Sequence, residues 1–232
     1  WDKPDPEQRI LKVYMAKRSS RYTEQGDPVD AETLTDITDC MDMEKCLLTL
    51  DVKDSAWSIF ILYLTRKGGE EATKDYLNPL VKEATQVLIA EVYEPHYAHY
   101  KDDFGTLIEG FFSDEPRFGN EKGTEARIGS DMVLPWREGL EKELGFDAKY
   151  LPLLWVNANG VEAEIRYRYM NLITKLYRDN FTNILSDWCH AHGVMYLGHT
   201  IEDNGAHARL GYGTGHYFRG QETMDYAGID VI

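Results

Sequence analysis

The chain has 232 residues, of which 43% are hydrophobic and 28% charged, with 19 glycines, 8 prolines and 3 cysteines. This composition is typical of a globular protein and excludes collagen-like, disordered and disulfide-scaffold classes. A formal net charge of −15 would repel the phosphates of nucleic acids and anionic membranes, so we expect neither as a partner. The chain also lacks an apolar run of the roughly 20 residues that a membrane-spanning helix needs.

The cysteines Cys40, Cys46 and Cys189 are odd in number and form no CxxC pair. We expect free thiols, with a Cys40–Cys46 bridge as the alternative. Free thiols slightly favour a cytoplasmic over a secreted protein. The localisation nevertheless stays unknown, because the chain opens at Trp1 without a methionine and localisation signals could have been lost if the native N-terminus is missing.

The first 75 residues contain two β-rich segments, 10–16 and 57–65, separated by a polar stretch. The polar stretch contains no convincing crossover helix, so we expect the two segments to pair antiparallel. Residues 1–75 are therefore predicted to form a small β-rich insertion or subdomain.

From residue 76 onward, predicted helices alternate with predicted strands. A first helix starts at Asn78-Pro79 and is expected to kink or end at Pro95. Its apolar face is predicted from helical spacing to comprise Leu80, Ala84, Val87, Leu88 and Val92. A long helix over about 162–190 and a short one over 217–226 follow, and the strands are expected at 107–113, 194–200 and from 228.

This alternation predicts parallel strands with right-handed crossovers. An open doubly wound sheet and a closed eight-stranded barrel both fit the order of elements. A full barrel needs about 250 residues, whereas three to four strand–helix units already occupy this chain and its last strand begins at the final residues. We therefore predict an α/β fold with a partial (β/α)8 TIM-type barrel over 76–232, truncated before its last strands.

Two of the predicted strands run directly into acidic residues. Asp114 and Glu115 follow the first, and Glu202, Asp203 and Asn204 follow the second. Functional side chains gather at the carboxyl ends of parallel strands, and two carboxyl groups facing one cleft suffice for glycosidic bond cleavage. The alternative is that these are ordinary loop or helix-capping carboxylates.

Several histidines follow the same strand and raise a second possibility. His199, His207 and His216, together with Glu202 and Asp203, could in principle bind zinc. The chain has no HExxH motif or similarly compact spacing, so hydrogen bonding to sugar hydroxyls is the preferred interpretation of this set.

Four segments resemble a known family. They are DYLNPL at 75–80, the stretch from FG at 104–105 through GFFSDEP at 110–116, GHTIEDN at 198–204 and GHYFR at 215–219. With them, the chain resembles the catalytic barrel of bacterial glycoside hydrolases of the α-L-rhamnosidase-like group, over roughly residue 75 to the end.

The resemblance implies that Glu115 is the general acid and that Asp114 contacts the substrate. His199, Asp203, Asn204 and His207 would line the sugar subsite, with Arg219 as an orienting group. Glu202 is the second catalytic candidate. In an inverting enzyme the carboxyl groups of Glu115 and Glu202 would lie about 6.5–9.5 Å apart. In a retaining enzyme the nucleophile would come from a later strand, and this piece alone would be inactive.

The sequence thus predicts part of a glycoside hydrolase that acts on complex glycans, with α-L-rhamnosides first among the substrates. Its expected partners are an oligosaccharide and the remainder of its own barrel. No organic cofactor is expected, and a structural Ca²⁺ is left open without any supporting ligand spacing. The alternatives are a non-catalytic carbohydrate-binding barrel and a metal-dependent hydrolase that uses His199, His207 and His216.

Overall fold

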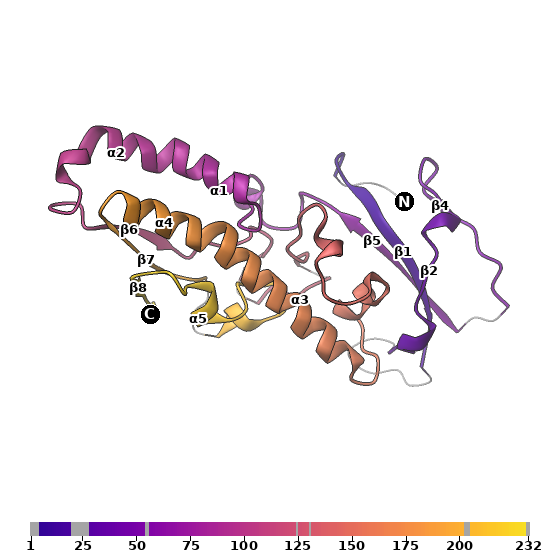
Figure 1. Ribbon diagram of the computed structural model, residues 1–232. Helices are drawn as coiled ribbons and strands as arrows, with labels where there is room; N and C mark the ends of the chain where they lie inside the picture. The colour runs from indigo at the N-terminus through magenta and orange to yellow at the C-terminus, as the bar shows by residue number, and fades with distance from the viewer. Residues whose placement is uncertain are drawn as a thin grey trace. The chain divides into compact units, whose positions relative to one another are not determined.

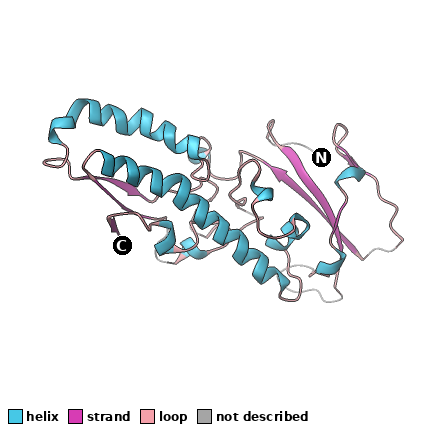
Figure 2. Cartoon of the chain, viewed as in Figure 1, coloured by secondary structure: helices cyan, strands magenta, loops and turns pink. Residues whose placement is uncertain are grey.

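The computed structural model describes residues 5–19, 28–53, 56–123, 125–129, 131–201 and 205–230. Its helices and strands are shown in Figure 1 and coloured by type in Figure 2. The chain forms two compact units, and each unit is built from two separate segments. The first combines Trp1–Lys67 with Gly139–Tyr169, and the second combines Gly68–Glu138 with Met170–Ile232. Within the described ranges, no helix has both the length and the apolar character needed to cross a bilayer.

The first unit is organised around an antiparallel sheet in the order β2-β1-β5. The two predicted strands are present and pair with each other over most of their length. The strands are β1 (Arg9–Lys17), β2 (Thr35–Asp36) and β5 (Trp57–Leu64), with a separate hairpin of β3 (Met41–Asp42) and β4 (Leu47–Leu48). Short 3-10 helices complete the unit: η1 (Ala31–Thr33), η2 (Thr38–Cys40), η6 (Leu140–Lys142) and η7 (Ala148–Leu154).

Burial on both faces of β1 explains why this segment forms the centre of the sheet. Val13 is buried in a cluster with Ile37 and Met41, while Tyr14 and Ala16 are buried as well. The end of β5 is fixed by the buried Asp5, whose carboxylate accepts hydrogen bonds from the Thr65 hydroxyl and the Arg66 amide, both at 2.8 Å. The alternation of side chains along a strand thus places apolar groups on both sides of β1.

The second unit contains a parallel sheet in the order β6-β7-β8. Its strands are β6 (Gly110–Asp114), β7 (Met195–His199) and β8 (Tyr226–Ala227). The helices are α1 (Lys82–Leu88), α2 (Glu94–Tyr100), α4 (Asn183–Ala191) and α5 (Tyr217–Gly220), together with the end of α3 (Val161–Tyr177), whose residues up to Tyr169 belong to the first unit. Short 3-10 helices are η3 (Glu71–Thr73), η5 (Lys101–Asp103) and η9 (Ala206–Ala208).

The predicted partial TIM-type barrel is wrong. The parallel sheet of the described residues has three strands, and the other strands belong to small antiparallel sheets. Alternating helices and strands do predict parallel pairing, which β6, β7 and β8 show. Closure into a barrel depends in addition on strand number, tilt and stagger, and the alternation pattern does not encode these quantities.

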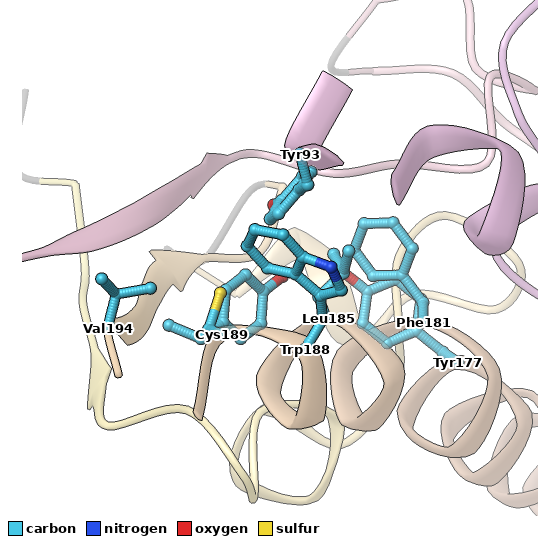
Figure 3. Close-up of a cluster of buried hydrophobic side chains, with 8 residues drawn as sticks. Tyr93, Tyr177, Phe181, Leu185, Trp188, Cys189 and Val194 are labelled. Atoms are coloured by element: carbon cyan, nitrogen blue, oxygen red, sulfur yellow. The ribbon is translucent and has the colours of Figure 1, made fainter. Parts of the chain in front are cut away.

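An aromatic cluster joins the helices of the second unit to one face of the parallel sheet (Figure 3). Its buried members are Tyr93, Tyr177, Phe181, Leu185, Trp188, Cys189, Val194 and Tyr196. Tyr93 stacks on Phe111 of β6 with ring centroids 4.4 Å apart and meets the edge of Trp188 at 5.2 Å. The Trp188 indole donates to the Glu94 carboxylate at 2.7 Å, so its polar atom is satisfied. Ring packing of this kind fixes the helices against the strands.

Two helical segments of the chain, 82–100 and 161–191, are each interrupted by a π turn. These turns are η4 (Ile89–Tyr93), between α1 and α2, and η8 (Arg178–Thr182), between α3 and α4. In this part of the chain Thr85 and Tyr93 are buried, whereas Val87 and Val92 of the predicted apolar face are 61% and 39% exposed. Pro95 lies within α2 and does not end the helix. In a regular helix the Pro95 ring would clash with the carbonyl of Glu91, four residues earlier. Glu91 lies in the π turn η4, where the helix is not regular.

Candidate functional site

The carboxyl ends of β6 and β7 bring two of the predicted site residues into contact. Asp114 and His199 are paired in the strand register, and Asp114 Oδ1 lies 3.1 Å from His199 Nε2. The His199 side chain is 8% exposed, whereas that of Asp114 is 79% exposed. Phe112, two residues before Asp114 and on the same face of β6, meets the His199 ring at 5.7 Å in an edge arrangement. The histidine is therefore fixed, and the carboxylate is accessible to a solute.

Gly198 permits this close approach of the two strands. A Cβ atom at this position would lie 2.4 Å from the carbonyl oxygen of Ser113. On the opposite face of the sheet, the buried Tyr196 hydroxyl donates to Ser113 Oγ at 2.9 Å. Ser113 and Gly198 thus form a tight contact directly before Asp114 and His199.

Glu115, the predicted general acid, lies in a strained backbone conformation. Its φ is 44°, in the left-handed region that is uncommon for residues other than glycine. The following residue, Pro116, is buried. Strained residues of this kind cluster at functional sites and persist only where the surrounding structure enforces them. The turn places the Glu115 carboxyl directly after β6, where its side chain is 31% exposed.

Two charged residues that the sequence analysis missed lie beside Glu115. Arg117 Nη2 is 3.3 Å from Glu115 Oε2, and Arg117 Nη1 is 3.5 Å from Glu121 Oε1. The Glu121 side chain is only 4% exposed. Burial raises the pKa of the Glu121 carboxyl, against the opposing effects of its own amide, Arg117 and the Asn120 amide. The four-residue spacing of Arg117 and Glu121 is the one sequence signal for this pair, and it does not indicate burial.

The loop that contains Arg117 and Glu121 is fixed by buried hydrogen bonds. The side-chain amide of Asn120 donates to the carbonyls of Val133, at 2.6 Å, and Gly211, at 2.9 Å. The Thr73 hydroxyl donates to the Gly119 carbonyl at 3.2 Å. These contacts connect the loop after β6 to three other segments of the same unit, so its charged side chains project from a rigid backbone.

The remaining predicted site residues are placed less completely. Glu202, Asp203 and Asn204 lie outside the described residues, so the separation of Glu202 from Glu115 is not defined. The His207 ring lies against the Tyr217 ring, with centroids 5.5 Å apart. Arg219 Nη1 donates to Asn171 Oδ1 at 2.6 Å, which connects α5 to α3.

The histidines do not assemble a metal site in the described ranges. No group of three or more histidine, cysteine, aspartate or glutamate side chains there could hold a metal ion. His216 instead caps α5, where its Nδ1 accepts a hydrogen bond from the Arg219 amide at 3.3 Å. The three cysteines are free thiols, as expected.

Comparison with known proteins bears on the fold of this chain. No family model matches the sequence, and no curated protein matches it. A solved structure of a rhamnosidase from Novosphingobium sp. PP1Y is similar, with a TM-score of 0.53 and 17% sequence identity. The match covers 85% of this chain and 19% of the rhamnosidase chain, so this chain spans about a fifth of that enzyme's length. At this identity the likeness shows the fold alone.

Proposed function

We propose that this chain forms part of a glycosidase that cleaves glycosidic bonds in complex glycans, with α-L-rhamnosides as the first substrates to test. One observation supports the proposal above others. Asp114, Glu115 and His199 gather at the carboxyl ends of two adjacent parallel strands, and Asp114 contacts His199. This is the edge of a parallel α/β sheet where ligands bind. The fold likeness to part of a rhamnosidase supports the same assignment.

In this proposal, Glu115 is the general acid that protonates the oxygen of the leaving group. When the substrate enters, one oxygen of the Glu115 carboxyl faces the glycosidic oxygen while Oε2 keeps its contact with Arg117. Glu202, in the loop after β7, is the second carboxylate and either activates water or binds the sugar. Carboxylates that follow two neighbouring parallel strands can act on the same glycosidic bond.

The polar residues around these carboxylates bind the sugar hydroxyls in the same proposal. Asp114 accepts hydrogen bonds, and His199, held by the edge of Phe112, presents its ring at a fixed angle. The further subsite residues are Asp203, Asn204, His207 and Arg219. A fixed histidine beside an exposed carboxylate offers a donor and an acceptor at the spacing of adjacent hydroxyls.

The decisive experiment is Glu115→Gln in the full-length protein, assayed on aryl glycosides with good and poor leaving groups. Loss of a general acid should reduce kcat/KM by about 100- to 10,000-fold for the poor leaving group and far less for the good one. Glu109→Gln is the matched control, because Glu109 is exposed and precedes the opposite end of β6. An unchanged rate on the poor leaving group would remove Glu115 from the mechanism.

A binding function without cleavage is the second candidate, and the contact between Glu115 and Arg117 favours it. The Glu115 carboxyl, in contact with Arg117, could accept hydrogen bonds from sugar hydroxyls without taking part in proton transfer. Calorimetry with rhamnose-containing and galactose-containing oligosaccharides, together with a hydrolysis assay, separates the two functions. Binding without turnover would support the second candidate and contradict the first.

A further inference from the structure

We propose that Arg117 is a positioning residue that fixes the Glu115 carboxyl and is itself held in place by the buried Glu121. This inference rests on the proposed function, since positioning matters only if Glu115 takes part in a reaction. Neither Arg117 nor Glu121 belongs to the set of residues that the sequence resemblance assigns to the site. The two residues connect the accessible carboxyl after β6 to the interior of the second unit.

The geometry of the guanidinium supports a bridging role. Its two terminal nitrogens face different carboxylates, with Nη2 at 3.3 Å from Glu115 and Nη1 at 3.5 Å from Glu121. A guanidinium is planar and offers five donors in a fixed arrangement, so fixing one edge also fixes the direction of the other. A lysine ammonium has the same charge but no such plane, and it could not hold both carboxylates in one geometry.

Glu121 is suited to be the fixed end of this bridge. Its side chain is 4% exposed, and its Oε2 accepts the Asn120 amide proton at 3.0 Å. A carboxylate this deeply buried needs a charged partner, and Arg117 supplies it. Glu115, in contrast, is 31% exposed, so its carboxyl is accessible to a ligand while Arg117 holds it.

Backbone packing prevents the bridge from shifting as a whole. A Cβ at Gly69 would lie 2.0 Å from the carbonyl oxygen of Gly119, which shows how closely the two loops approach. A Cβ at Gly119 would in turn lie 3.0 Å from both the Thr73 carbonyl oxygen and the Tyr76 Cβ. The backbone between Arg117 and Glu121 is therefore closely packed, which limits the movement of both side chains.

The test compares Arg117→Lys and Glu121→Gln with the wild-type full-length protein on an aryl rhamnoside. We expect kcat to fall by about 10- to 100-fold in both variants, because a displacement of about 1 Å at a reacting group has effects of that size. KM should stay within about threefold of the wild-type value, because neither side chain is assigned a direct contact with the sugar. If Arg117 and Glu121 only stabilised the fold, the variants would give less folded protein. The folded fraction would then keep the wild-type kcat and KM.

Arg168→Lys is the matched control. Arg168 also pairs with a glutamate, Glu164, at 2.6 Å, but both side chains are exposed and lie on α3 in the first unit. This variant should retain wild-type kcat and KM. Chemical rescue adds a second criterion: guanidinium ion should restore part of the activity of Arg117→Ala and none of that of Glu115→Gln.

The outcomes are distinct. If the wild type hydrolyses the substrate and folded Arg117→Lys and Glu121→Gln keep wild-type kcat, the positioning role is wrong and the proposed function stands. If the wild type hydrolyses no glycoside, the proposed function fails and the positioning role fails with it. If Glu121→Gln does not fold, nitrogen-15 NMR of the wild-type arginine side chains decides. Slow rotation of the Arg117 guanidinium supports the bridge, and free rotation overturns it.

Discussion

His199 Nε2 lies 3.1 Å from Asp114 Oδ1, and the two residues are direct partners in the parallel pairing of β7 with β6. The pair is asymmetric, because the histidine side chain is 8% exposed and the carboxylate is 79% exposed. Packing therefore determines where His199 lies, while Asp114 is free to contact a solute. Because of this asymmetry, substitution of His199 should affect stability more than substitution of Asp114.

We predict that His199→Ala lowers the free energy of unfolding by about 1–3 kcal/mol, since it removes a buried ring that packs on Phe112. Asp114→Asn should change it by less than about 1 kcal/mol, because ion pairs with an exposed member contribute little. Urea unfolding followed by circular dichroism measures both values. A larger loss from Asp114→Asn than from His199→Ala would contradict this view of the pair.

The contact between Gly198 and Ser113 leads to a second prediction. In Gly198→Ala, the added methyl would lie 2.4 Å from a backbone oxygen, so β6 and β7 must separate. We expect a loss of about 2–4 kcal/mol in the free energy of unfolding. Gly193→Ala is the control: Gly193 has φ of 72° but no atom within 4 Å of the added Cβ, so only about 1 kcal/mol of backbone strain should result. Equal losses in the two variants would show that the strands accommodate the methyl group.

The sequence predicted the elements that periodicity specifies. The long helix expected over 162–190 is present as α3, η8 and α4, and its side chains Tyr169, Ile173 and Leu185 are fully buried. The exposure of Val92 was not predictable, because regular helical spacing assumes 3.6 residues per turn and the π turn η4, which contains Val92, changes the spacing locally. Val87 lies in α1 before this turn, and its exposure has no explanation in helical spacing.

The candidate site was predictable only in part, for a similar physical reason. Asp114, Glu115 and His199 follow apolar strands, so their place at the sheet edge can be inferred from local sequence. The burial of Glu121 depends on contacts of its loop with residues distant in the chain, such as Thr73 and Gly211. Local patterns contain no information about such contacts, so Arg117 and Glu121 were missed.

The three thiols should differ in reactivity. Burial raises the pKa of the Cys189 thiol to about 12, so almost none of it is thiolate at pH 8 and it is also inaccessible. Cys40 is exposed and Cys46 is partly exposed. Titration of the native protein with a thiol reagent should detect Cys40 and Cys46 rapidly, and Cys189 only after unfolding. The variant Cys189→Ser should leave the rapid phase unchanged, and rapid labelling of Cys189 in the native state would contradict the prediction.

Asp225 should make stability dependent on acidic pH. Burial opposes its ionisation, but hydrogen bonds from the Tyr196 amide at 2.8 Å and the His190 ring at 2.9 Å outweigh burial and lower its pKa. Its contribution to stability is therefore fully present above the unfolded-state pKa of about 3.9 and is lost as pH falls through the lower folded-state value.

The free energy of unfolding of the wild type should accordingly fall as the pH decreases below about 4. Asp225→Asn should be less stable than the wild type at pH 7 and should lose less stability over the acidic range. Urea unfolding at a series of pH values provides the measurement, with Asp187→Asn on the exposed side of α4 as the control. Parallel pH profiles for the wild type and Asp225→Asn would show that Asp225 does not cause the loss of stability at acidic pH.

The interleaved segments of the two units have a consequence for synthesis on the ribosome. The first unit needs residues 139–169 and the second needs residues 170–232, so neither can be completed when only the first 138 residues have been made. Strand β6 must also wait for β7, about 80 residues later, before it gains its parallel neighbour. Nascent chains halted in this interval would expose the side chains that later form the aromatic cluster, and those chains are the natural targets of chaperones.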